Sequence, residues 1–420
     1  MSAHARAGRD VVVIGGGVAG LATAALLGQA GERVTVVEKN RAGGGRMDEL
    51  EVAGFRFETG PSWYLMPEVF EWFFGHFGLS TDELYGLRRL DPAYRVVGKN
   101  RDVVDVETGR ADALFERLDP GSGARLAGYL RSAAQAYRTA EQKFLFTTFS
   151  RPRDLCSWEV ACQLPRLARL LIEPLRAKAR RVTRHPVLRQ ILEYPAVFLS
   201  SRPDQIPSLY HLMSHADLSA GVFYPEGGFS AITRALERVC ADAGVELRYG
   251  CRATRIVTRG HGRDRRATGV CVEPSGGDGH GAGETLACDA VVSCADLHHT
   301  ETQLLGEEER SRSRRWWASR DPGLSAVVVL LGVRGAVAGL AHHTLFFEPD
   351  WDRDFDTVFG GPKSIAAPRA APAELARLGF DLRVRGEQDQ PRGCPGRLRE
   401  PFRARTRPGR PRDRVRRRLR

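Results

Sequence analysis

The sequence predicts an α/β fold, because a strand, a glycine-rich turn, a helix and a second strand follow one another at the amino end. Residues 11–14 form a continuous apolar run, which is typical of a strand buried on both faces of a parallel sheet. Residues 20–29 carry small and apolar side chains at helical spacing, and Gly31 marks the end of that helix. Residues 34–37 are again apolar and lead into Glu38. Together these segments predict a Rossmann-type βαβ unit.

The rest of the chain predicts a second, α+β part inserted into this fold. Residues 91–215 are rich in Arg and Leu and follow helical periods, notably over 124–146 and 162–181. A further amphipathic helix is expected at 230–243, with Ser230 as its N-cap. Strands are expected at 245–249, 253–258, 267–273, 285–293 and 324–333, with the glycine-rich residues 275–283 as a hairpin tip.

This pattern predicts a discontinuous domain organisation. We assign residues 1–90 and 220–300 to the nucleotide-binding domain, and residues 91–219 and 301–365 to a domain that faces the substrate and the membrane. Residues 366–420 lose all periodicity and are expected to form a disordered tail, because they cannot bury enough apolar surface to offset the entropy of ordering.

The charge of the chain is concentrated in that tail. The net charge is +12 in total, yet residues 366–420 hold 17 Arg and only 6 acidic residues. The other 365 residues hold 46 basic and 45 acidic side chains and are therefore nearly neutral. This distribution gives no reason to expect nucleic acid as a partner of the folded part.

Cysteine spacing and the length of the apolar runs argue against a metal site and against a membrane-spanning segment. The eight cysteines include no C-x-x-C and no spacing typical of a metal site, so we expect reduced thiols in a cytoplasmic protein and no metal. The adjacent pairs His298-His299 and His342-His343 would be poor chelates on a strand, where neighbouring side chains point to opposite faces. No signal peptide is recognisable, and the longest apolar run, 324–331, is too short to cross a bilayer. Any membrane association is therefore expected to be peripheral, and the oligomeric state cannot be predicted.

The turn after the first strand carries the strongest chemical signal. It reads Gly15-Gly16-Gly17-Val18-Ala19-Gly20, in which Gly15 permits the tight turn, Gly17 lets a pyrophosphate approach the backbone and Gly20 lets helix and strand pack closely. The phosphates would then lie against free N–H groups at the positive end of the helix dipole. Glu38 would accept hydrogen bonds from a ribose and would repel a 2′-phosphate, which disfavours NADP.

Two further segments point to FAD rather than NAD. Bare backbone at Gly43-Gly44-Gly45 allows close approach to a ligand, and Arg46 adds a fork that suits phosphate. Residues 57–62 then read Phe-Glu-Thr-Gly-Pro-Ser. The run "VVVIGGGVAGLATAALL…VTVVEKN…GGGRM…FRFETGPSWY" resembles the flavin-containing amine oxidase and phytoene desaturase superfamily. There the second glycine stretch touches the FAD pyrophosphate, and the Gly-Pro segment passes near the flavin ring.

The resemblance becomes more specific along the chain. The stretches "YPEGGFSAITRAL", "DAVVSCADLHHTETQLL" and "HHTLFF…FGGPK" look like those of bacterial carotenoid desaturases of the phytoene desaturase type, over about residues 10–363. The resemblance implies an FAD-dependent dehydrogenase of a long isoprenoid hydrocarbon, while the proton acceptor cannot be assigned. The positions that it implies for FAD contact are Gly15, Gly17, Gly20, Glu38, Gly44, Arg46, Gly60 and Pro61, with the strand-edge backbone at Ala253 near the adenine and Ala295 and Asp296 flanking the cofactor.

Other interpretations stay open at this point. A flavin amine oxidase acting on another substrate and an inactive flavoprotein remnant are the alternatives to a desaturase. Residues 164–181 alternate Leu and Arg, which suits either a helix lying in anionic lipid headgroups or a packed helix with a solvated basic face, although Pro174 should kink it. The resemblance stops after Lys363, so we expect either a frameshift into an Arg-rich reading or a genuine basic tail that binds anionic lipid.

Overall fold

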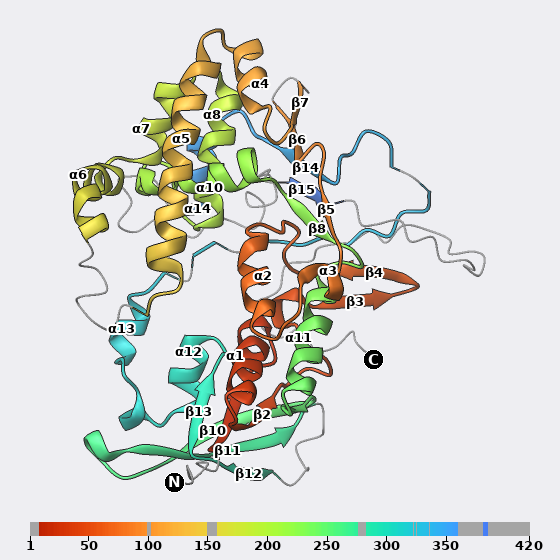
Figure 1. Ribbon diagram of the computed structural model, residues 1–420, viewed down its shortest axis with the longest axis vertical. Coiled ribbons are helices and arrows are strands. Elements are labelled where there is room, and N and C mark those ends of the chain that lie inside the picture. The colour runs from red at the N-terminus through yellow and green to blue at the C-terminus, as the bar shows by residue number, and fades with distance from the viewer. Residues whose placement is uncertain are drawn as a thin grey trace. The chain divides into compact units, whose positions relative to one another are not determined.

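The structure of the protein is a computed structural model. It describes residues 8–98, 102–148, 158–275, 283–321, 323–324, 326–335, 337–359 and 381–384, all of which lie in one compact unit that ends at Glu387 (Figure 1). None of the helices in these ranges combines the length and the apolar character that a membrane span requires.

A four-stranded parallel sheet organises the part of the fold that contains the glycine-rich turn of residues 15–20. Its order is β13 (Ala290–Ser293), β1 (Asp10–Ile14), β2 (Arg33–Val37) and β9 (Glu246–Arg248). Every neighbouring pair in this sheet is parallel. The predicted α/β class is confirmed, and residues more than 200 positions apart in the sequence pair as neighbouring strands of one sheet.

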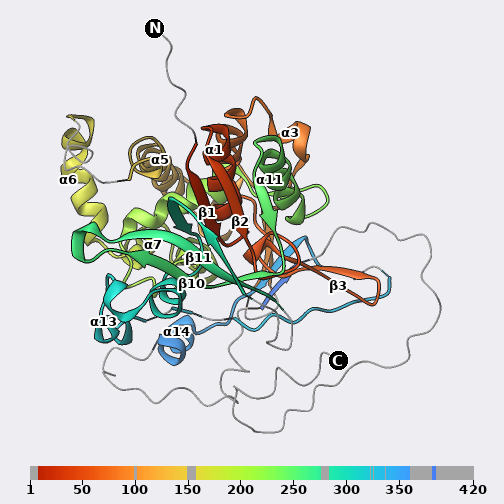
Figure 2. The same ribbon diagram turned by 90° about the horizontal axis from the view of Figure 1, so that it is seen from below.

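Helices cover one face of this sheet. Helices α1 (Val18–Gln29) and α11 (Ser230–Asp242) lie side by side against it, as Figures 1 and 2 show. Val11 and Val13 of β1 belong to the same buried cluster as Leu21 of α1 and Leu236 of α11. Because strand side chains alternate between faces, the intervening Val12 and Ile14 point the other way.

A three-stranded antiparallel sheet covers the opposite face. It consists of β10 (Cys251–Arg259), β11 (Arg266–Pro274) and β12 (Glu284–Ala287). Val12, Ile14 and Val37 are buried together with Val270 and Val272 of β11. Both faces of β1 are therefore apolar and buried, which explains its uninterrupted run of aliphatic residues. The segment predicted as one strand at 285–293 is in fact two strands, β12 and β13.

The inserted region is mainly helical. The helices are α4 (Ala111–Leu118), α5 (Ser122–Ala140), α6 (Trp158–Ile172), α7 (Leu175–Val182), α8 (Pro186–Glu193), α9 (Pro195–Phe198) and α10 (Leu212–His215). Pro174 separates α6 from α7 by adopting an extended conformation, so the predicted kink is a break between two helices. A π-helical turn, Glu141–Leu145, extends α5.

A second sheet accompanies these helices and makes the region α+β. Its order is β15 (Asp381–Val384), β14 (His343–Phe346), β6 (Tyr94–Val97) and β7 (Val103–Val106). Strand β15 lies inside the predicted tail 366–420. The other tail residues lie outside the described ranges, so the expected disorder of the tail stays a prediction.

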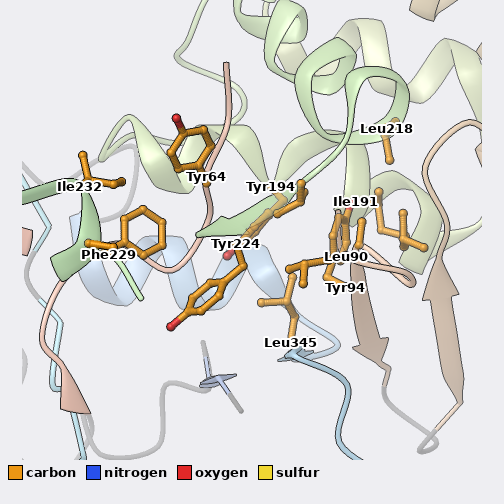
Figure 3. Packing of buried hydrophobic residues seen from close by; sticks show 14 of the residues in the cluster. Tyr64, Leu90, Tyr94, Ile191, Tyr194, Leu218, Tyr224, Phe229, Ile232 and Leu345 are labelled. Carbon is orange, nitrogen blue, oxygen red and sulfur yellow. The ribbon is translucent and has the colours of Figure 1, made fainter. Parts of the chain in front are cut away.

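An aromatic core joins the inserted region to the rest of the unit. Figure 3 shows Tyr94 and Ile191 to one side of Leu345, and Tyr64, Tyr224 and Phe229 to its other side. All six residues belong to one buried cluster. Smaller elements complete the described fold, namely the hairpin β3 (Glu49–Val52) and β4 (Phe55–Glu58), the pair β5 (Leu87–Arg89) and β8 (Phe223–Pro225), and the helices α2 (Pro67–Gly75), α3 (Thr81–Leu84), α12 (Leu297–His299), α13 (Arg314–Ala318) and α14 (Trp351–Phe359).

Two local predictions are wrong. Ser230 is the first residue of α11 rather than its N-cap, and its hydroxyl donates to Oε2 of Glu49 at 2.9 Å. The described residues of 324–333 form no strand, and Val327 is 92% exposed. A run of β-branched side chains favours a strand only where a neighbouring strand is available to pair with it.

Candidate functional site

The predicted glycine-rich turn leads from β1 into α1. Gly15 has a φ of +104°, which favours glycine, and its N–H donates to the carbonyl of Val37 at 2.8 Å. A Cβ on Gly20 would lie 1.8 Å from the carbonyl oxygen of Gly15, so helix and turn pack too closely for any side chain there. Gly17 is the N-cap of α1 and makes no side-chain cap. The N–H groups of the first helical turn are therefore left for a ligand.

Glu38 is held at the carboxyl end of β2. Its side chain is 6% exposed, and its Oε2 accepts the N–H of Gly16 at 2.8 Å while Oε1 accepts the N–H of Asn40 at 2.8 Å. Each carboxylate oxygen keeps a further lone pair for a ribose hydroxyl. Sequence reasoning predicted neither contact, and through the first one Glu38 also fixes the glycine-rich turn.

The second glycine stretch lies directly against the first. The N–H of Gly44 donates to the carbonyl of Gly16 at 2.9 Å, and Gly17 and Gly44 form a parallel β-bridge. A Cβ on Gly45 would lie 3.2 Å from the Cα of Gly17. Arg46 follows in a short 3-10 turn, is exposed and makes no ion pair with the described residues. The two stretches therefore form a cradle of bare backbone with one available cation beside it.

The Gly60-Pro61 segment packs onto this cradle. A Cβ on Gly60 would lie 1.7 Å from the carbonyl oxygen of Arg46, and the N–H of Thr59 donates to the carbonyl of Asp48 at 3.0 Å. Only a residue without a side chain allows this approach.

Glu58, which precedes this segment, is a residue that sequence reasoning missed. Its Oε2 accepts the hydroxyl of Tyr224 at 2.5 Å, and its Oε1 accepts the N–H of Phe229. Burial raises the pKa of the Glu58 carboxyl. Tyr224 and Phe229 belong to the stretch 224–236, so Glu58 ties the segment before Gly60-Pro61 to the start of α11. The only signal in the sequence was the presence of an acid beside a glycine-proline pair.

The predicted residues Ala295 and Asp296 follow β13, the neighbour of β1. The N–H of Cys294 donates to the carbonyl of Ile14 at 2.9 Å, and a Cβ on Gly15 would lie 3.4 Å from the nitrogen of Ala295. Asp296 is exposed and caps α12, because its Oδ1 accepts the N–H of His299 at 3.0 Å. Ala295 is thus brought to the turn, while the Asp296 carboxylate is already used as a helix cap.

Ala253 lies on β10, at the free edge of its sheet. The N–H of Cys251 donates to the carbonyl of Glu38 at 2.8 Å, which brings the start of β10 to the end of β2. The pairing of β10 with β11 shifts register between Ala253 and Arg255. A strand edge with an irregular ladder leaves backbone groups available, and the contact of Ala253 with an adenine stays a prediction.

The histidine pairs differ from their predicted geometry. His342 and His343 do not point to opposite faces, because their Nδ1 atoms lie 3.3 Å apart and only His343 belongs to β14. His298 and His299 lie on α12 rather than on a strand. Within the described residues, no cluster of three or more His, Cys, Asp or Glu side chains is arranged to hold a metal ion.

The residues of this site fit a dinucleotide. The free helix N-terminus and the bare-backbone cradle suit a pyrophosphate, and the buried Glu38 carboxylate suits a ribose. Residues 18–350 match the family described as flavin containing amine oxidoreductase. The protein belongs to this family. The expected flavin cofactor and the oxidoreductase class are thereby confirmed.

Comparison with individual proteins narrows the relationship within the family. A carotenoid 3,4-desaturase of Haloarcula japonica is 40% identical over 358 residues, which cover 84% of this chain and 69% of that protein. A zeta-carotene-forming phytoene desaturase of Myxococcus xanthus is 33% identical over 89% of this chain and 71% of that protein. A phytoene dehydrogenase of Streptomyces griseus is 35% identical over 82% of this chain, but the match spans 64% of the relative.

Proposed function

We propose that the protein is an FAD-dependent desaturase that dehydrogenates a long isoprenoid hydrocarbon such as phytoene in carotenoid biosynthesis. The observation that carries the proposal is the joined cradle of residues 15–17 and 43–45 beside buried Glu38, in a chain that is 40% identical to a carotenoid 3,4-desaturase. The cradle supports the cofactor, and the related desaturases support the substrate class.

The residues of the chain have defined tasks in this proposal. N–H groups at the start of α1 and the backbone of Gly44 and Gly45 would hold the pyrophosphate, with Arg46 as the nearby cation. Glu38 would hold the adenosine ribose, and Gly60-Pro61 would lie along the flavin. FAD supplies the hydride-accepting chemistry when it is bound, while the protein orients the substrate and excludes water.

The substrate class implies contact with a membrane. A forty-carbon chain would cost on the order of 30 kcal/mol to move into water, at ~0.8 kcal/mol per CH₂. We therefore propose peripheral membrane association, in which the hydrocarbon passes from the bilayer directly into the protein. Leu164, Leu171 and Ile172 of α6 are 57%, 54% and 82% exposed, which supports contact between this helix and lipid. Leu170 of the same helix is buried, so α6 also packs on the protein.

Expression of the full chain in cells that accumulate phytoene tests the proposed function. Pigment analysis should show conversion of phytoene to products with more conjugated double bonds. A flavin-loaded protein that leaves phytoene unchanged and produces hydrogen peroxide with an amine would favour the amine oxidase alternative. Purified protein without a visible flavin absorption band, even after incubation with FAD, would favour an inactive remnant.

A further inference from the structure

A basic pocket lies between α5, α6 and α7, away from the glycine cradle. Its volume is about 480 Å³. Five of its lining side chains are cationic and come from all three helices: Arg125 from α5, Arg166 and Arg169 from α6, and Lys178 and Arg181 from α7. No acidic side chain lines the pocket among the described residues.

Nearby carboxylates balance only part of this charge. Arg169 and Arg181 both pair with Glu173, and Arg125 lies 3.7 Å from Asp119. Arg166 and Lys178 have no carboxylate partner among the described side chains. Two carboxylates therefore face five cations.

The two unpaired cations are held in place by neutral groups. Nη2 of Arg166 donates to the carbonyl of Ser132 at 2.8 Å. Nζ of Lys178 lies 5.9 Å from the centre of the Tyr129 ring. Burial, together with the nearby Arg169 and Arg166, lowers the pKa of Lys178 to about 8. These contacts with neutral groups hold Arg166 and Lys178 beside the other cations of the pocket, despite the repulsion between them.

We propose that this pocket binds a phosphate group. A bound phosphate would supply the missing negative charge, and arginine forks match its oxygens with paired hydrogen bonds. The exposed Leu164, Leu171 and Ile172 on α6 favour the headgroup of an anionic phospholipid as the source of the phosphate, with a soluble diphosphate as the other source. The inference rests on the geometry of this pocket and does not depend on the proposed desaturation.

Binding assays on the purified full chain distinguish the sources. The variants are Arg166→Gln and Lys178→Gln, and the control is Arg131→Gln, an exposed arginine on α5 that does not line the pocket. Binding is measured by co-sedimentation with vesicles of phosphatidylglycerol or phosphatidylcholine, and by calorimetry with sodium diphosphate. Each pocket variant should weaken phosphate binding about fivefold, as expected for about 1 kcal/mol per cation, while the control retains full affinity.

The binding results distinguish a lipid headgroup, a soluble phosphate compound and no phosphate ligand at all. Loss of phosphatidylglycerol binding in the pocket variants, with diphosphate competing in the unmodified protein, assigns the pocket to a lipid headgroup. Loss of diphosphate binding with unchanged vesicle binding assigns it to a soluble phosphate compound. Equal binding of pocket variants and control to both probes would overturn the proposal. These results hold whether or not the protein desaturates phytoene, so the two proposals fail independently.

A second measurement avoids substitutions altogether. Lys178 in the unmodified protein should react with an amine-selective acylating reagent, because its lowered pKa leaves part of it unprotonated near pH 8. Diphosphate or phosphatidylglycerol vesicles should protect Lys178 from the reagent, as followed by mass spectrometry of the peptides. Modification of Lys178 at the same rate with and without both probes would contradict phosphate binding in this pocket.

Discussion

The peptide N–H of Gly44 donates to the carbonyl oxygen of Gly16 at 2.9 Å, so the second glycine stretch is fastened to the first by their own backbones. Gly44 also has a φ of +114°, a conformation that side chains disfavour. The cradle proposed for the FAD pyrophosphate is therefore built from two segments of the chain. A change in either segment should disturb FAD binding.

Substitution of Gly44 by alanine tests this dependence. The added Cβ would lie 2.9 Å from the carbonyl oxygen of Met47 and 3.2 Å from the Thr233 hydroxyl, so the second stretch must move. The matched control is Gly54→Ala, which has a φ of +78° and open space around the new Cβ. Gly54→Ala should lose about 1 kcal/mol of stability from backbone strain alone, and Gly44→Ala should lose more because of the close contact. Only Gly44→Ala should lose bound flavin, as measured from the absorption of the purified protein.

Glu38→Ala should weaken FAD binding at least about tenfold. The substitution removes the proposed ribose ligand. It also leaves the buried N–H of Gly16 without its acceptor at 2.8 Å, and an unsatisfied buried donor costs about 1–3 kcal/mol. Fluorescence titration with FAD measures the effect. Glu51→Ala on exposed β3 provides the control. Equal dissociation constants for the two variants would show that Glu38 does not contribute to FAD binding.

The contact between Glu58 and Tyr224 should contribute to the stability of the segment before Gly60-Pro61. A double-mutant cycle of Glu58→Gln and Tyr224→Phe isolates the hydrogen bond of 2.5 Å. We expect a coupling energy on the order of 1 kcal/mol in urea unfolding. Additive effects of the two substitutions would show that this hydrogen bond stabilises nothing.

Asp217 should make stability depend on pH. Its carboxyl is buried, accepts the Tyr94 hydroxyl at 3.1 Å through one oxygen, and its other oxygen has no hydrogen-bond partner in the described part of the chain. Burial raises the pKa of Asp217 from 3.8 to about 7. The folded state therefore holds this proton more tightly than the unfolded state, so the contribution is favourable at low pH and is lost as the pH rises from about 4 to about 7.

Asp217→Asn removes this titration. At pH 8 the variant should be more stable than the unmodified protein by up to about 4 kcal/mol, and the difference should shrink as the pH falls towards 4. Thermal unfolding across this range measures it. Asp242→Asn on the surface, where the side chain is 67% exposed, should show no such trend. A stability difference for Asp217→Asn that stays constant with pH would argue against a neutral buried carboxyl.

The local parts of the fold were predictable, whereas the long-range pairings were not. The segment from β1 to β2 followed from apolar periodicity and glycine chemistry within forty residues. By contrast, β6 pairs with β14 through Arg95 and Thr344, far apart in the sequence, and no periodicity encodes that partner. For the same reason the pattern of 324–333 predicts a strand, whereas its described residues pair with no other described strand. Glu58 was missed because its partners, Tyr224 and Phe229, come together only in the folded chain. The proposed domain boundaries stay a prediction.

The central claim, that the cradle holds FAD for dehydrogenation of an isoprenoid hydrocarbon, is tested most directly by anaerobic mixing of the FAD-loaded full chain with phytoene in liposomes. We predict loss of the oxidised flavin absorption band together with the appearance of a more conjugated polyene. An oxidised flavin spectrum that phytoene leaves unchanged, in protein that demonstrably binds FAD, would contradict the account.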